Sequence, residues 1–243
     1  MLITANDIIK ESYLVYKNNW RNLAVYVGLL LLPSLILSFL GVVGVYLSNY
    51  HSALTLVTNL VILAVFAASL IFSVWASIAL TREMANLINH QTVNWKINFT
   101  GSSTLIWPVL YTSFFVGIIV FGGTLLLIVP GIIFAGWYMF ATNSVILDGK
   151  KGVEAMRFSK DMVAGRWFAV VWRMLVPALV FALVVMALQY ALILPVDYLI
   201  SSPTVLLVLN PIINSVINMI FTPFAIAASL FLYFSVKANP MTK

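Results

Sequence analysis

Cysteine is absent from the sequence, so disulfide bonds, thiolate metal sites and cysteine nucleophiles are excluded. Charge is almost as scarce, because only 8% of the 243 residues are Asp, Glu, Lys or Arg. A soluble domain averages roughly 25%, and a globule so poor in charge cannot cover its surface against water. Since 63% of the residues are hydrophobic, lipid must surround much of the chain.

Apolar runs long enough to cross a bilayer recur along the chain, since a spanning helix needs about 20 mostly apolar residues. We predict six spans, at residues 23–47, 53–80, 105–129, 131–147, 167–194 and 204–236. Pro130 and Gly131 separate the third span from the fourth and are interpreted as a hairpin tip, because proline cannot continue the helical hydrogen-bond ladder. The sixth span contains Pro211 and Pro223, so it is predicted to be kinked or to begin as a short separate helix.

The positions of the cationic residues predict the orientation. Lys and Arg occur at Lys10, Lys17, Arg21, Arg82, Lys96, Lys150, Lys151, Arg157, Lys160, Arg166, Arg173, Lys237 and Lys243. All lie in or beside the two termini and the loops 81–104 and 148–166, whereas the connections 48–52, 129–131 and 195–203 contain none. By the positive-inside rule, both termini and both long loops face the cytoplasm. We therefore expect a multi-pass protein of the cell (inner) membrane.

Two segments next to the spans are predicted to be amphipathic helices at the membrane interface. Residues 5–20 carry four large side chains at helical spacing, which are Ile9, Tyr13, Tyr16 and Trp20. The charged residues of this segment lie on the opposite face of the helix. Residues 150–165 carry a charged stripe: Lys150, Glu154, Arg157 and Asp161. Two interpretations of these helices stay open. In the first they bind lipid headgroups or make a regulatory contact, and in the second they form an interfacial collar that orients the next span.

These elements predict an all-α fold, a single domain over residues 1–243 built as a polytopic membrane bundle of six transmembrane helices and two interfacial helices. The chain also carries a weak internal similarity. Aligning Trp20 with Trp167 brings Ser12 opposite Ser159. We therefore expect three successive units, each a short helix followed by an apolar hairpin.

Polar residues inside the predicted spans are candidate functional groups. The sixth span carries Asn210, Asn214, Asn218 and Thr222, which are four residues apart and share one helical face. In hydrocarbon such a face needs partners, so it lines a cavity for a small solute or lipid headgroup, or it packs by interhelical hydrogen bonds.

Arg173 is the second candidate, because it lies well inside the fifth span, where a charge is costly. Either its side chain extends to the cytoplasmic headgroups, or it forms an intramembrane ion pair with Glu83. That carboxylate stands at the end of the second span, on the same predicted side.

A family resemblance enters over residues 125–171. This stretch combines Pro130-Gly131, a span ending in Asp148-Gly149, and Ala155, Ser159 and Gly165-x-Trp167. Over residues 100–195 the sequence resembles the membrane domain found upstream of some bacterial glycerophosphoryl diester phosphodiesterases, and related stand-alone bacterial inner-membrane proteins of unassigned role. The resemblance implies a six-helix membrane module. In the fused relatives the diesterase chemistry resides in a separate soluble barrel, which we expect to be absent here.

Catalytic groups do not converge in this predicted topology. His51 lies in an outer turn and His90 in a cytoplasmic loop, so they cannot share a metal ion. Zinc-protease spacing, a Gly-x-Ser-x-Gly elbow, a Walker loop and paired carboxylates within the spans are all missing. The sequence therefore predicts no catalytic, cofactor-binding or metal-binding residue.

The resulting functional hypothesis is a non-enzymatic bacterial membrane protein in membrane or lipid homeostasis, or an accessory partner of another membrane protein. A small transporter for a solute or lipid, using the asparagine face, is the alternative, and a lipid-acting enzyme is the remote one. The expected partners are the bilayer, lipid headgroups or another membrane protein, and nucleic acid is not expected.

Reporter fusions test the orientation. Tags at both termini, within 85–100 and within 150–163 should report the cytoplasm, because the cationic residues gather there. Tags at 49–51 and 198–202 should report the outer side. A fusion that places 150–163 outside would overturn the six-span arrangement, since that loop carries the largest number of Lys and Arg.

Overall fold

The computed structural model describes residues 2–48, 52–91 and 94–240, and these ranges are helical with short connections. The elements, in chain order, are α1 (Ala5–Ser48), α2 (Ser52–Ile88), α3 (Trp95–Gly101), η1 (Ser103–Leu105), α4 (Ile106–Leu126), α5 (Ile128–Tyr138), α6 (Ala141–Asp148), α7 (Gly152–Val163), α8 (Trp167–Leu199) and α9 (Pro203–Ala238). The all-α prediction is confirmed for the part of the chain that is described. The predicted outer turn at 49–51, with His51, lies outside it.

Six segments of the described chain are long and apolar enough to cross a membrane. They are Ala5–Gly44, Thr55–Ile88, Trp95–Leu126, Ile128–Asp148, Trp167–Leu199 and Val205–Ala238. Each contains one of the six spans expected from the sequence, or most of it. The helices extend beyond those spans because polar residues at their ends continue the same helical backbone.

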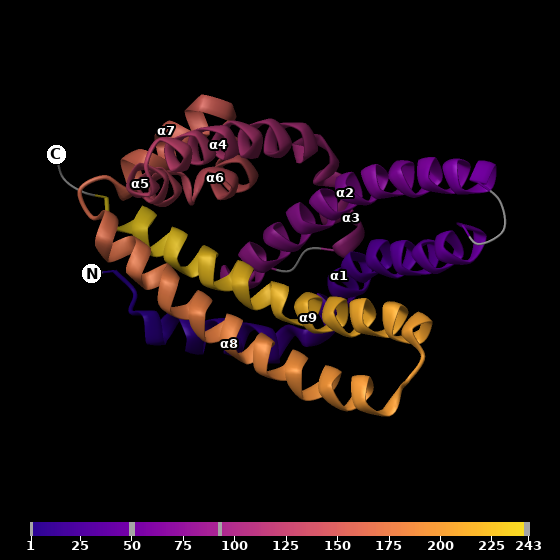
Figure 1. Cartoon of the computed structure of the whole chain (residues 1–243). Coiled ribbons are helices and arrows are strands. Elements are labelled where there is room, and N and C mark those ends of the chain that lie inside the picture. The colour runs from indigo at the N-terminus through magenta and orange to yellow at the C-terminus, as the bar shows by residue number, and fades with distance from the viewer. Residues whose placement is uncertain (1, 49–51, 92–93, 241–243) are drawn as a thin grey trace.

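The long helices pair as hairpins, α1 with α2, α4 with α5 and α8 with α9, and α9 also packs on α1 and α2. Figure 1 shows α9 between α8 and the layer that α4 to α7 form, with the α1–α2 and α8–α9 hairpins pointing to the same side. The core surrounds the C-terminal half of α9. Its buried residues there are Ala227, Ala228, Leu230, Leu232, Tyr233 and Val236.

A shorter helix precedes each hairpin. In α1 the backbone at Asn19 is non-helical (φ −123°, ψ 19°), and Asn19 Nδ2 donates to the Val15 carbonyl, which separates the first turns from the spanning part. α3 precedes α4, and α7 precedes α8. The structure thus contains the expected succession of short helix and hairpin three times. The two predicted interfacial segments correspond to the start of α1 and to α7.

The tip of the second hairpin differs from the prediction. The chain reverses at Leu127, whose backbone is extended (φ −159°, ψ 142°), and α5 begins at the next residue. Pro130 therefore lies in the first turn of α5, where proline costs little because the amide has no intrahelical partner. Gly131 serves packing instead, since a Cβ atom there would lie 2.0 Å from Thr124 Oγ1 on α4.

The returning half of this hairpin is broken between α5 and α6. Ser159 of α7 satisfies the backbone at the break, because its hydroxyl donates to the Trp137 carbonyl (2.7 Å) and accepts from the Phe140 amide (3.1 Å). Non-helical backbone at membrane depth is tolerated only where protein supplies such partners. The sixth predicted span, unlike the fourth, contains no break, because α9 is one helix that includes both Pro211 and Pro223. The expected separate helix before Pro211 is therefore absent from the described chain.

Polar contacts join α6 and α7 to the end of α9. Asp148, the last residue of α6, accepts hydrogen bonds from the Tyr233 hydroxyl and from Lys237 Nζ. The Arg166 guanidinium donates to the carbonyls of Met162 (3.0 Å) and Val236 (2.9 Å), and burial lowers the pKa of Arg166. It thereby supplies a partner for the last carbonyls of α9, which have no intrahelical donor.

Replacing Asp148 tests how strongly this junction holds the fold. Asp148→Ala leaves the buried Tyr233 hydroxyl without its acceptor, so the free energy of unfolding should fall by about 1–3 kcal/mol. Thermal unfolding in detergent measures the loss. Glu154→Ala is the control, because it removes a carboxylate from an exposed pair with Lys150 and should cost no more than about 0.5 kcal/mol. Equal losses in the two variants would contradict a structural role for Asp148.

Candidate functional site

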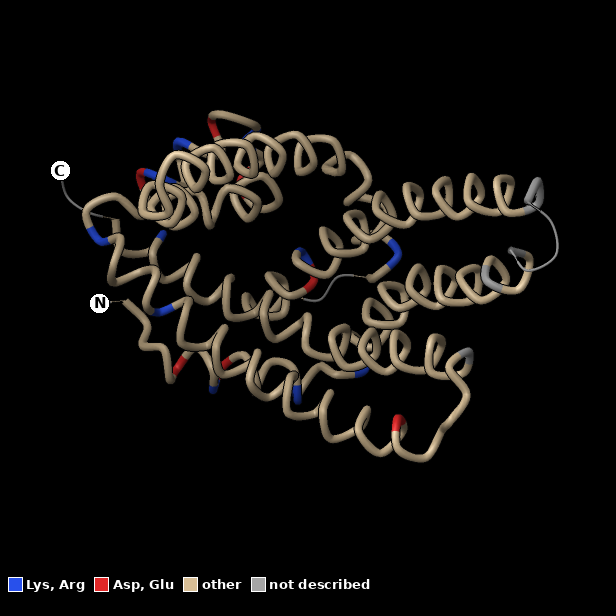
Figure 2. The backbone as a smooth tube through the Cα atoms, viewed as in Figure 1, with Lys and Arg blue, Asp and Glu red and all other residues tan. Residues whose placement is uncertain are grey.

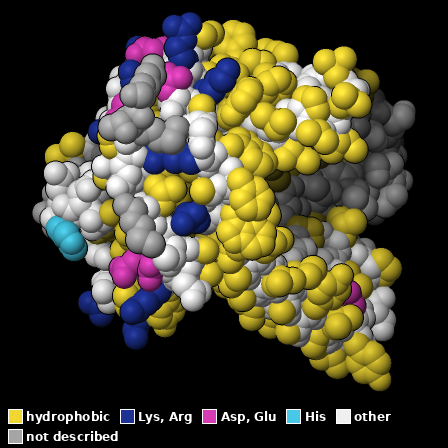
Figure 3. Space-filling view, turned by 90° about the vertical axis from the view of Figure 1, so that its left-hand side faces the viewer, with side chains coloured by type: hydrophobic (Ala, Val, Ile, Leu, Met, Phe, Trp, Pro, Cys, Tyr) yellow, Lys and Arg dark blue, Asp and Glu magenta, His cyan; other side chains and the backbone are white. Residues whose placement is uncertain are grey.

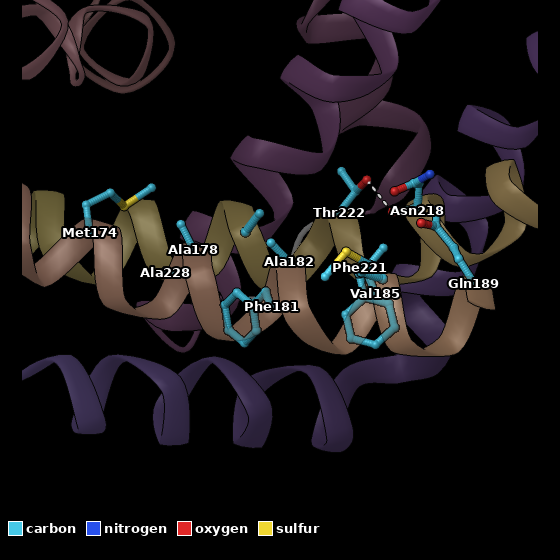
Figure 4. Close-up of a pocket in the computed structure, with 12 residues that line it drawn as sticks. Met174, Ala178, Phe181, Ala182, Val185, Gln189, Asn218, Phe221, Thr222 and Ala228 are labelled. Atoms are coloured by element: carbon cyan, nitrogen blue, oxygen red, sulfur yellow. Dashed lines mark hydrogen bonds between the residues drawn. The ribbon is translucent and has the colours of Figure 1, made fainter. Parts of the chain in front are cut away.

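A groove of about 530 Å³ runs between α8 and α9, along the segments that are long and apolar enough to cross a membrane (Figure 4). Its lining residues are Met174, Ala178, Phe181, Ala182, Val185, Met186 and Gln189 from α8, and Asn218, Phe221, Thr222, Ala225 and Ala228 from α9. Alanine contributes four of these positions, and its short side chain leaves the space between the helices unfilled. The groove therefore follows from small residues at the positions where α8 faces α9.

Phenylalanine rings stabilise the helix pair beside the groove. The Phe224 ring of α9 lies 5.8 Å from the Phe181 ring of α8 and 5.5 Å from the Phe221 ring, measured between centroids. Such aromatic pairs are favourable beyond their buried area. The two helices are thus held together without filling the groove.

The groove continues toward the α8–α9 turn as a second cavity of about 370 Å³. Met186 and Gln189 line both cavities, and Asn214 of α9 lines the second. Figure 4 shows Gln189, Asn218 and Thr222 toward one end of the groove and Met174 at the other. One end is therefore polar, and the rest is apolar.

The polar side chains at this end are anchored by their own helix. Asn218 Nδ2 donates to the Asn214 carbonyl (2.8 Å), and the Thr222 hydroxyl donates to the Asn218 carbonyl (2.9 Å). These bonds satisfy part of the hydrogen-bonding capacity of the polar face, as a helix in hydrocarbon would require. The carboxamide oxygen of Asn218 accepts no hydrogen bond from any described residue, so it is available to a ligand.

The predicted asparagine face divides into two parts. Asn210 Nδ2 donates across to Asp197 Oδ1 on α8 (2.9 Å), which is the interhelical packing role. Asn214, Asn218 and Thr222 border the groove, which is the cavity role. The structure thus places Asn210 in a contact between helices and the other three residues beside a groove, and the two interpretations of their role stay predictions.

Gln189 was missed by the sequence reasoning, although its signal is simple. It is a single carboxamide in the otherwise apolar run of α8 between Arg173 and Asp197. Polar residues within a span mark sites by default, and a scan of every span for carboxamides finds it. Its position opposite Asn214 and Asn218 requires the structure, because it depends on how α8 rotates against α9.

The ion pair between Arg173 and Glu83, one of the two alternatives for Arg173, is not formed. Arg173 Nε donates to the Ile3 carbonyl (2.9 Å), and its Nη1 donates to the Ala169 carbonyl (2.8 Å). The salt bridges among the described residues are Lys150–Glu154 and Lys237–Asp148. Arg173 therefore fixes the chain before α1 instead of neutralising a carboxylate.

Glu83 has neutral partners in place of Arg173. Its buried carboxylate accepts from the Tyr26 hydroxyl (3.2 Å) and from Asn98 Nδ2 (3.1 Å). Asn98 also donates to the Ala79 carbonyl (3.1 Å). This network joins α1, α2 and α3, and sequence spacing does not reveal it because each partner comes from a different element.

The groups at the polar end of the groove are carboxamides and a hydroxyl, which donate and accept hydrogen bonds and do not titrate near neutral pH. No three His, Cys, Asp or Glu side chains of the described ranges lie together as metal ligands would. Comparison of the chain with protein-family models, curated proteins and solved structures gives no match.

A double-mutant cycle tests the separate partners of Arg173 and Glu83. Arg173→Gln and Glu83→Gln should each lower thermal stability in detergent, because each removes hydrogen bonds that hold a different helix. The combined loss should equal the sum within about 0.5 kcal/mol. If the double variant loses about 1 kcal/mol less than the sum, the two side chains interact, as the ion-pair hypothesis requires.

Proposed function

We propose that this chain is a non-enzymatic integral membrane protein that binds a membrane lipid in the groove between α8 and α9. The single observation that carries the proposal is the division of the groove into a long apolar part and one polar end. A lipid has the same division between its hydrocarbon chain and its ester or hydroxyl groups. Both parts of the ligand then meet matching protein surface.

The charge distribution supports a membrane location. Figure 2 shows few charged residues on the projecting parts of the α1–α2 and α8–α9 hairpins. Asp197, near the end of α8, is an exception. Figure 3 shows dark-blue and magenta side chains gathered on one side of the molecule beside two apolar lobes. Lys and Arg lie at the start of α1, at the end of α2, around α7, at the start of α8 and at the end of α9. We accordingly assign this charged end and both termini to the cytoplasmic side of a cell membrane.

The exposure of α8 supports a lipid or protein neighbour along it. In its most apolar stretch no described residue is buried. Exposed apolar side chains on such a helix, including Leu179, Leu183 and Leu188, require hydrocarbon or a partner to cover them. An accessory role beside another membrane protein fits this surface.

Transport of a small solute is the second candidate, favoured by the polar lining at Asn214, Asn218 and Thr222. Discontinuous helices with exposed backbone near the midplane are a recurrent feature of transporter sites. Here α9 continues through Pro211 and Pro223 as one helix. Lipid binding is therefore the better supported of the two.

Filling the groove tests lipid binding. Ala182→Phe places a ring in the groove, so the lipid that co-purifies with the full chain should fall about tenfold, as the loss of roughly 1.4 kcal/mol of binding energy predicts. Native mass spectrometry measures the bound lipid. Ala187→Phe is the matched control, because it adds the same ring to α8 at an exposed position that does not line the groove. Its lipid content should equal that of the unmodified chain.

Asn214→Leu tests the polar end in the same measurement. A ligand that bonds there should be lost while the unfolding temperature stays within a degree or so of the parent, whereas a packing role lowers stability and leaves lipid bound. Lipid retained by Ala182→Phe would overturn the proposal. Solute uptake into proteoliposomes that Asn214→Leu abolishes would favour transport instead.

A further inference from the structure

A separate cavity, of about 320 Å³, lies between α7 and the α4–α5 hairpin, away from the groove between α8 and α9. Phe115 and Ile119 of α4 and Tyr138 of α5 form its apolar wall, and Arg157 and Lys160 of α7 stand at its edge. The volume lies at the lower end of the range for ligand pockets, about 300–1,000 Å³. Two cations thus adjoin an apolar surface that continues along a membrane-spanning helix.

Neither cation is neutralised by a carboxylate within the described residues. Arg157 is exposed and makes no hydrogen bond or ion pair there, and Lys160 Nζ lies 4.4 Å from the centre of the Trp137 ring. Of the two acids of α7, Glu154 pairs with Lys150 (2.8 Å) and Asp161 lines a different cavity. The pair therefore keeps its charge available to an anion.

A neighbouring cavity that is lined by Arg166 and Lys237 lacks this property. Arg166 donates to backbone carbonyls, and Lys237 is bound to Asp148. Their donors are used in holding the end of α9. Of these two cavities, the one lined by Arg157 and Lys160 has cationic donors that form no ion pair with the described residues.

The position of α7 fixes which anion fits. The helix is attached to α4 at its start, where the Gly152 amide donates to the Thr112 hydroxyl (2.9 Å), and its inner face buries Ala155 and Met156. The exposed ring of Phe115 lines the same cavity as the two cations. A guanidinium binds phosphate through two parallel hydrogen bonds, and an ammonium binds it as a point charge.

We propose that this cavity binds an anionic phospholipid of the cytoplasmic leaflet, with its phosphate between Arg157 and Lys160 and an acyl chain along Phe115 and Ile119. The site shares no residue with the groove between α8 and α9. It depends on the proposed function only through the orientation of the chain in the membrane. It assigns α7 a ligand in addition to its packing role.

Native mass spectrometry of the full chain in detergent tests this site, with phosphatidylglycerol and phosphatidylcholine as probes. The unmodified chain should prefer phosphatidylglycerol by about tenfold or more, because each Lys or Arg near an anionic headgroup contributes about a fivefold gain in affinity. The double variant Arg157→Gln/Lys160→Gln should lose that preference with an unchanged unfolding temperature, since Arg157 is exposed and Lys160 only half-buried. Lys10→Gln/Lys17→Gln is the control, because it removes the same amount of charge from exposed positions of α1. This variant should keep the preference for phosphatidylglycerol.

Three outcomes would overturn the inference. The first is a double variant that keeps the preference, and the second is a control that loses it equally, which would indicate a general effect of charge. The third is displacement of phosphatidylglycerol by millimolar inorganic phosphate, which would identify the ligand as the free anion. Ala182→Phe separates the two sites, because it should lower the number of bound lipids without changing the preference for phosphatidylglycerol.

Discussion

The fold depends on the C-terminal half of α9, where side chains from both ends of the sequence are buried together. Tyr26 and Leu23 of α1, Leu80 and Met84 of α2 belong to the clusters that α9 completes. The hydroxyl of Tyr233 and the ammonium of Lys237 bring α6 to the same helix through Asp148. In hydrocarbon, where apolar burial between helices gains little over lipid contact, such close packing and satisfied polar groups decide association.

Concentrating the core at one end has a direct effect at the other. The hairpins diverge away from the packed end, and apolar side chains along α2, α4 and α8 are exposed. Figure 3 shows a hollow between two apolar lobes. The groove between α8 and α9 belongs to this less packed region, and there the carboxamides of Gln189 and Asn218 adjoin unfilled space. Most of the described buried residues and the two ion pairs of the described chain lie toward the charged end, whereas the groove between α8 and α9 extends into the more exposed apolar part.

The sequence predicts the spans well because hydrocarbon imposes one strong requirement, a continuous apolar helix. Local exceptions to this requirement are harder to predict. Pro130 looks like a helix end but is accommodated in the first turn of α5, and Pro211 and Pro223 are included within α9. The actual turn depends on one extended residue, Leu127, whose side chain is no different from its neighbours.

Part of the candidate site can be predicted from the sequence, because helical spacing is a local property, but the residues that face it across the groove cannot. Helical spacing shows that Asn214 and Asn218 share a face, but not whether the facing helix carries alanine or a larger side chain at the same level. The partners of Glu83 come from two other elements, α1 and α3, so only the tertiary fold shows that Tyr26 and Asn98 replace Arg173. Long-range polar contacts of this kind have no periodic pattern.

The central position of α9 also affects how the protein is made. α9 follows every other described helix in the chain, yet α1, α2 and α8 all pack against it. α1 and α8 are therefore synthesised before a helix against which each packs extensively. Asp148 is likewise synthesised before Tyr233 and Lys237, the two residues that donate hydrogen bonds to it. The core around the end of α9 can thus assemble only after every other described helix has been made.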